Sequence, residues 1–240
     1  MGTNVRQNIV TNGLLLYLDA GSKMSYISGS TTWSDLSSNN NSGSLTNGPI
    51  FNSTNQGSIT FDGTNDYVAM QKIATRLATD NFTMELWCKP TSTITVPAES
   101  TSGFAGVTGQ RYAIEPFYGD TQNPGAGVSV GTNGIAVVEH KFNYAPALLS
   151  IAITLSSTIF SHIVITYTSK QPRAYVNGIL VRTGLTSLQS GVDLISNQIG
   201  GMGYGYFAGD IANVKWYNRT ISDQEVAQNY NATKTRFGLT

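Results

Sequence analysis

The acidic residues of this chain do not have the spacing of a glycosidase pair. Glycoside hydrolysis needs two carboxyl groups about 5–9.5 Å apart, which residues at i and i+2 or i+4 of one strand can provide. Glu85 is followed at those positions by Trp87 and Lys89. Glu115 and Asp120 are five residues apart, so they would face opposite ways on a strand. The sequence therefore predicts no catalytic residue, and a glycoside hydrolase is the least favoured function.

The two histidines and the single cysteine do not indicate nucleophilic catalysis either. Neither His140 nor His162 lies in a G-x-S-x-G context. His162 opens an alternating strand pattern, so we interpret it as a structural or surface residue. Cys88 also lies in an apolar strand pattern and is predicted to be a small buried hydrophobe, unable to form an intrachain disulfide.

Aromatic residues gather in three Gly- or Pro-rich segments, where they suggest a carbohydrate-binding face. Sugar recognition uses aromatic rings together with a few well-placed polar groups. Tyrosine at the end of a strand also commonly covers the edge of a core with its hydroxyl in water, so both interpretations stay open. The segments 111–120, 139–146 and 201–210 supply the candidate ligand-binding residues Tyr112, Glu115, Tyr118, His140, Asn143, Tyr144, Tyr204 and Tyr206.

Two loops carry side-chain oxygens that suit Ca²⁺. DLSSNNNSG (35–43) has the 1-3-5-7 spacing of an EF-hand loop, but its sixth and twelfth positions lack the required Gly and Glu. FDGTND (61–66) offers two further carboxylates. Runs of Asn, Ser and Gly also form turns through local side-chain hydrogen bonds, so Ca²⁺ is left open as the only cofactor. The candidate ligands are Asp35, Asn39, Asn41, Asp62 and Asp66.

The charge balance excludes several partner classes. Lys and Arg together number 14, as do Asp and Glu, so no overall field attracts nucleic acid or an anionic membrane. No window approaches 18 apolar residues, so no membrane insertion is expected. The first residues lack a basic segment followed by an apolar run, so no signal peptide is visible.

Strand patterns recur along the whole chain and predict an all-β protein. In residues 81–90, apolar and polar positions alternate with period 2. Asn177-Gly178 between AYV and ILV predicts a type I′ hairpin. Helical pieces are expected loosely over residues 72–79 and after Thr220, where Ser222 and Glu225 form a capping box.

The domain organisation follows from the even density of strands. No linker, charge block or repeat divides the chain, so we predict a polar N-terminal arm over residues 1–12 and one domain over residues 13–240. Many short strands with polar turns indicate a sandwich of two antiparallel sheets, or jelly roll.

The order of the motifs resembles the laminin-G-like branch of the concanavalin A-like lectin/glucanase superfamily. The resemblance covers roughly residues 12–235, and the closing segment also resembles that of pentraxins. It implies a jelly roll with one short helix near the C-terminus. Pentraxins carry a calcium-binding acidic cluster before the closing strand, whereas residues 199–209 of this chain contain no acid. The motifs are LYLDAG, TTWSDLSSNNNSGSLTNGP, SITFDGTNDYV, FTMELWCKP, HIVITY, AYVNG and GDIANVKWYNRTISDQEV.

Two segments further resemble proteins encoded by tailed bacteriophages, namely LDAG near the start and QNYNATKTRFG near the end. This resemblance implies a non-catalytic module on the virion surface, outside the cell, which binds carbohydrate or another feature of the host surface. The alternative is a purely structural decoration protein, held by capsid or tail proteins. The arm would then pack on a neighbouring subunit, and a homo-oligomer is also left open.

Overall fold

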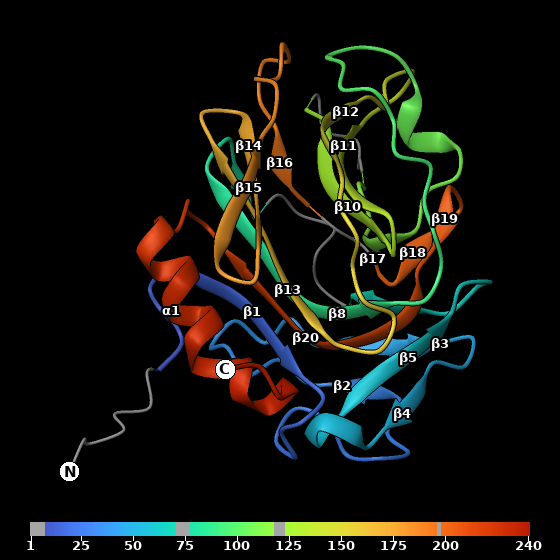
Figure 1. Cartoon of the computed structure of the whole chain (residues 1–240), viewed down its shortest axis with the longest axis vertical. Coiled ribbons are helices and arrows are strands. Elements are labelled where there is room, and N and C mark those ends of the chain that lie inside the picture. Colours follow the sequence, from blue (N-terminus) through green and yellow to red (C-terminus); the bar gives the residue numbers. More distant parts are fainter. Residues whose placement is uncertain (1–7, 71–76, 118–122, 196–197) are drawn as a thin grey trace.

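The computed structural model describes residues 8–70, 77–117, 123–195 and 198–240, and these form two stacked β-sheets (Figure 1). The first sheet has the order β15-β14-β13-β8-β20-β5-β4, with β1 also paired to β20. Its strands are β1 (Leu14–Asp19), β4 (Ile50–Asn52), β5 (Ser58–Asp62), β8 (Phe82–Pro90), β13 (Ser161–Thr168), β14 (Gln171–Val176), β15 (Ile179–Thr183) and β20 (Ala208–Tyr217).

The second sheet has the order β12-β11-β10-β9-β17-β6-β3-β2, with four short strands beside this path. Its strands are β2 (Thr32–Trp33), β3 (Gly43–Thr46), β6 (Tyr67–Met70), β7 (Ala78–Thr79), β9 (Tyr112–Ile114), β10 (Gly125–Gly131), β11 (Gly134–His140), β12 (Ala147–Ala152), β16 (Asp193–Leu194), β17 (Gln198–Ile199), β18 (Gly201–Met202) and β19 (Gly205–Tyr206).

Among the described residues, the strands pair antiparallel except in two short pairings, between β10 and β16 and between β9 and β19. The remaining elements are the helix α1 (Asp223–Thr233) and the short 3₁₀ turns η1 (Thr54–Gln56), η2 (Ala105–Val107) and η3 (Lys234–Phe237). The predicted jelly-roll sandwich with one C-terminal helix is therefore confirmed. Each parallel pairing involves a single pair of residues, which is too short to leave a pattern in the sequence.

The two faces of β8 explain how the layers are held together. Phe82, Met84, Leu86 and Cys88 are fully buried in the core between the sheets, as their period-2 spacing predicts. Burying each such side chain contributes about 1.5–3 kcal/mol. On the other face of β8, Trp87 stacks on the ring of Phe237 with centroids 4.3 Å apart.

Helix α1 lies against the outer face of the first sheet, beside β1 and β20 (Figure 1). The predicted capping box is present, since the Glu225 N–H donates to Ser222 Oγ (3.2 Å) and the Ser222 N–H donates to Glu225 Oε2 (2.8 Å). Val226 is buried and Tyr230 stacks on Trp87, so the acids of this segment start a helix that closes the fold.

Charged groups are buried under this helix. Lys215 Nζ lies 2.7 Å from Glu85 Oε1, and both side chains are fully buried. His162 Nε2 lies 3.1 Å from the same oxygen, and Asn229 of α1 donates to Glu85 Oε2 (2.6 Å). His162 is therefore structural, as one of its two interpretations predicts. The helix is fixed to the sheet by a polar network as well as by apolar contacts.

Two local predictions have different outcomes. The hairpin at Asn177-Gly178 is confirmed, with φ values of 51° and 81° joining β14 to β15. The prediction of a helix over residues 72–79 is wrong for Ala78–Thr79. These two residues form β7, whose backbone pairs with the neighbouring strand β16. Residues 72–76 lie outside the described part of the chain.

The described part of the predicted N-terminal arm, residues 8–12, packs against its own chain. Val10 is buried, and its N–H donates to Asn229 Oδ1 (2.7 Å). The Tyr217 hydroxyl donates to the Val10 carbonyl (3.1 Å). Residues 8–12 therefore help to hold α1 in place, whereas the decoration alternative expects the arm to pack on a neighbouring subunit.

Candidate functional site

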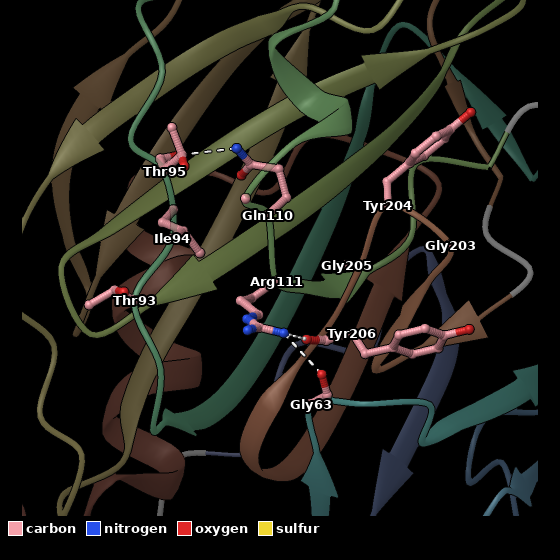
Figure 2. Close-up of a pocket in the computed structure, with 11 residues that line it drawn as sticks. Gly63, Thr93, Ile94, Thr95, Gln110, Arg111, Gly203, Tyr204, Gly205 and Tyr206 are labelled. Carbon is pink, nitrogen blue, oxygen red and sulfur yellow. Dashed lines mark hydrogen bonds between the residues drawn. The ribbon is translucent and has the colours of Figure 1, made fainter.

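A cavity of about 500 Å³ opens where four segments of the chain meet (Figure 2). They are the turn after β5, the segment after β8, the segment before β9 and the β18–β19 hairpin. Small-molecule sites in proteins typically have volumes of roughly 300–1,000 Å³. We call this space the Arg111 cavity; its lining residues are Gly63, Thr93, Ile94, Thr95, Gly109, Gln110, Arg111, Gly203, Tyr204, Gly205 and Tyr206.

Two glycines allow the walls of the cavity to approach each other closely. Gly109 has φ +68°, and a Cβ there would lie 2.1 Å from Thr95 Oγ1. Gly205 has φ +148°, and a Cβ there would lie 1.9 Å from the Gln110 carbonyl oxygen. Only glycine meets both the conformation and the spacing at these positions, so the shape of the cavity depends on them.

Gln110 joins the segments on one side of the cavity. Its side chain is buried, and Nε2 donates to the carbonyls of Thr95 (3.0 Å), Thr108 (3.3 Å) and Ala105 (3.4 Å). Because three carbonyls surround the amide nitrogen, the orientation of the amide is fixed. Oε1 has no hydrogen-bond partner among the described residues, and a buried polar atom of this kind is unusual.

Arg111 places a half-buried positive charge in the wall. Its Nη1 donates to the carbonyls of Gly63 (2.9 Å) and Tyr206 (3.3 Å), which belong to two different segments. Its backbone is held by β10, since its N–H donates to Ser129 Oγ and its carbonyl accepts from the Val130 N–H, both at 2.9 Å. The guanidinium is thereby oriented, and Figure 2 shows its other nitrogens on the side of Thr93 and Ile94.

Tyr204 and Tyr206 line the cavity on the side away from the Thr93–Thr95 segment, and Figure 2 shows both rings extending away from Arg111. The Tyr204 side chain is 38% exposed, and its ring meets the His140 ring edge-on with centroids 5.1 Å apart. His140 is buried, its Nδ1 lies 3.0 Å from the Pro116 carbonyl oxygen, and burial lowers its pKa. The structure therefore brings together three of the predicted ligand-binding residues.

Other predicted ligand-binding residues do not form an exposed face. Tyr112 is fully buried and donates to the Gly106 carbonyl (2.6 Å), so its ring cannot stack on a sugar. Glu115 is also fully buried, and neither carboxyl oxygen has a hydrogen-bond partner among the described residues. Burial raises the pKa of Glu115 to about 8. Tyr118 lies outside the described residues.

The segment 139–146 forms a hairpin end with a buried polar cluster. Tyr144 is buried and its hydroxyl donates to Glu139 Oε2 (3.1 Å), so it contributes to the interior and not to a binding face. Asn143 is exposed at the turn, with φ 54°. Ser187 and Tyr167 also donate to the Glu139 carboxylate, whose pKa burial raises to about 7.

The residues of the 35–43 loop do not fit a calcium ion. Asp35 Oδ1 accepts from the N–H groups of Tyr17 and Ser37, both at 2.9 Å. Its Oδ2 accepts from the Ser37 hydroxyl (2.7 Å) and the Asn41 N–H (2.8 Å). Four donors fill the acceptor positions of this carboxylate, while the Asn39 and Asn41 amides donate to the Leu14 and Leu15 carbonyls. The loop is a turn closed by its own side chains.

In the 61–66 loop, the second calcium candidate, one oxygen of each carboxylate accepts N–H groups of the turn. Asp62 Oδ1 accepts from the N–H groups of Thr64 (2.7 Å) and Asn65 (3.3 Å), and these bonds lower the Asp62 pKa. Asp66 is buried and its Oδ2 accepts from the Asp62 N–H (3.0 Å). No group of three or more His, Cys, Asp or Glu residues suited to a metal occurs in the described ranges.

Comparison with protein families gives one match. The profile of the Laminin_G_3 family, described as "Concanavalin A-like lectin/glucanases superfamily", matches residues 62–227, more than half of the chain. A search of curated proteins finds no match. Within the described residues, no helix is long and apolar enough to cross a membrane.

Solved structures share the fold at low sequence identity. They include the binding domain of Paraclostridial Mosquitocidal Protein 1 (18% identity, TM-score 0.64), the binding domain of botulinum neurotoxin DC in complex with rat synaptotagmin II (12%, 0.63), and domain 4 of AbnA, a GH43 extracellular arabinanase from Geobacillus stearothermophilus, in complex with arabinotriose (11%, 0.61). The alignments cover 92%, 92% and 90% of this chain and 52%, 52% and 98% of those chains. This chain thus spans about half the length of the two toxin binding domains.

Proposed function

We propose that this chain, which belongs to the concanavalin A-like lectin/glucanase superfamily, is a non-catalytic binding module that holds carbohydrate in the Arg111 cavity. The observation that carries the proposal is the cavity itself, whose lining combines Tyr204 and Tyr206 with threonine, glutamine and arginine residues. Exposed tyrosine rings can pack on sugar CH groups, and polar side chains bind hydroxyls.

The similar structures support a binding role. AbnA domain 4 is described in complex with arabinotriose, and botulinum neurotoxin DC binding domains are described in complex with synaptotagmin II and with SialylT. Glu115, just after β9, and Glu139 of β11 are buried acids that are not among the residues lining the cavity. A module that binds without turnover agrees with both observations.

We further propose that the module is displayed on a virion surface, outside the cell. The segments LDAG and QNYNATKTRFG, which resemble proteins of tailed bacteriophages, support a location on the virion. The second candidate function is a decoration protein held by capsid or tail proteins or by copies of itself. It is favoured by exposed apolar side chains, Met24 (84% exposed), Ile27 (66%) and Ile50 (69%), around two further hollows of about 350 and 480 Å³.

A glycan array on the purified protein tests the carbohydrate function, with and without EDTA. We expect saturable binding that EDTA does not change, and about tenfold weaker binding for Tyr204→Ala. Phe142→Ala is the matched control, because this ring is 73% exposed but does not line the cavity. A blank array from protein that melts cooperatively, together with a stable oligomer in sedimentation, would instead support the decoration function.

A further inference from the structure

Arg111 differs from the other arginines that the structure describes. Each of the others forms an ion pair with a carboxylate, whereas Arg111 has no carboxylate partner among the described residues. The four pairs are Arg173–Asp223 (3.0 Å), Arg182–Glu99 (2.5 Å), Arg219–Glu225 (2.7 Å) and Arg236–Asp19 (2.7 Å). A half-buried guanidinium with carbonyl acceptors but no carboxylate partner keeps N–H donors that can bind an anion.

Two acids close in sequence to the cavity walls, Asp62 and Asp210, already have partners. The Asp62 carboxylate, next to Gly63, accepts two N–H groups of its own turn. Asp210, which follows the β18–β19 hairpin, pairs with Lys89 at 2.7 Å. None of the eleven lining residues is acidic, so Arg111 gives the cavity a single, positive charge.

We infer that the Arg111 cavity selects sugars that carry a carboxylate, with the guanidinium of Arg111 as its counter-ion. This inference rests on the proposed carbohydrate function and names the ligand class. The two carbonyl bonds of Nη1 fix the plane of the guanidinium, and a planar fork of N–H donors matches a carboxylate. The remaining nitrogens lie toward Thr93 and Ile94, and the Thr93 side chain is exposed there (Figure 2).

The rest of the cavity suits the ring of such a sugar. The exposed Thr93 and Thr95 offer hydroxyls to the sugar's own hydroxyl groups, and the partly exposed Tyr204 and Tyr206 belong to the same lining. A volume of about 500 Å³ is sufficient for one or two sugar rings. Hexuronic acids and sialic acids share the required chemistry, a ring with hydroxyls and one carboxylate.

Isothermal titration calorimetry with matched ligands tests the inference. One pair is tetragalacturonate and its fully methyl-esterified form, which keeps the rings and removes the charge. The other pair is sialyllactose and lactose, which distinguishes sialic from uronic acids. We expect at least one acidic ligand to bind about tenfold more tightly than its neutral partner, with a preference that weakens as salt is added.

Substitutions at Arg111 test whether this residue causes the preference for acidic sugars. Arg111→Gln should remove the preference for the acid, while Arg111→Lys, which keeps the charge without the planar fork, should retain part of it. Arg173→Gln is the matched control, because Arg173 is paired on another surface, and it should leave the preference unchanged.

Equal binding of acidic and neutral ligands by the unaltered protein would overturn this inference and leave the carbohydrate function standing. Binding to neither pair, with a blank glycan array, would overturn both. An acid preference that survives in Arg111→Gln would also contradict the role of Arg111.

Discussion

Replacing Lys215 by methionine should strongly destabilise the protein, because it leaves Glu85 buried without its cation. The two side chains are fully buried and 2.7 Å apart. Removing one partner of a buried ion pair typically costs about 3–5 kcal/mol of unfolding free energy. For a domain of this size each kcal/mol lowers Tm by roughly 2–4 °C, so we expect a fall of about 6–20 °C.

The stability of the unaltered protein and that of Lys215→Met should change with pH in opposite directions. Burial alone would raise the pKa of Glu85, but the charge of Lys215 and the hydrogen bonds from His162 and Lys215 outweigh it and lower the pKa to about 2. In the unaltered protein this contribution to stability is therefore complete above pH 4.5 and lost as the pH falls toward 2. In Lys215→Met burial dominates, so the folded-state pKa rises above 4.5 and the variant should lose stability as the pH rises.

Urea unfolding followed by tryptophan fluorescence at pH 4, 6 and 8 measures both effects. The control is Arg182→Met, which breaks the Arg182–Glu99 pair at the surface, where Arg182 is 47% exposed. Surface pairs contribute at most about 1 kcal/mol, so the control should change little. If Lys215→Met costs no more than the control at pH 8, or if the gap does not narrow at pH 4, the reasoning about this buried pair is wrong.

Two further predictions concern the second sheet and the cavity. Burial raises the pKa of Glu115 to about 8, so its contribution to the unfolding free energy is complete below pH 4.5 and is lost as the pH rises to 8. The stability of Glu115→Gln relative to the unaltered protein should therefore increase between pH 5 and 8 in urea unfolding. A difference in unfolding free energy that stays constant over this range would contradict this prediction. Gly205→Ala should lose sugar binding on the array and about 1–3 kcal/mol of stability, because its Cβ would meet the Gln110 carbonyl at positive φ. Gly203→Ala has no atom within 4 Å of its Cβ and should bind normally; equal losses in both variants would refute this account of the cavity wall.

The candidate site could be predicted from the sequence only in part. Tyr204 and Tyr206 were indicated by their glycine-rich surroundings, and both line the cavity. Tyr112 has a similar setting in the sequence but is fully buried, because it packs with Val138, Ala145 and Ala147 and its hydroxyl donates to the Gly106 carbonyl. Thr93 and Thr95 belong to no sequence motif that would indicate a binding site. They line the cavity because the chain after β8 passes beside Gly109, whose carbonyl accepts from the Thr95 N–H.

The sequence by itself determined the sandwich, the Asn177-Gly178 hairpin and the capped helix α1, because these depend on period-2 alternation, on φ preferences and on hydrogen bonds between residues three apart. Only the tertiary structure decided which charges meet. Glu85 and Lys215 are 130 positions apart, and Arg111 is the described arginine that no carboxylate reaches. Such pairings depend on strand order and register across both sheets, which local sequence patterns do not encode.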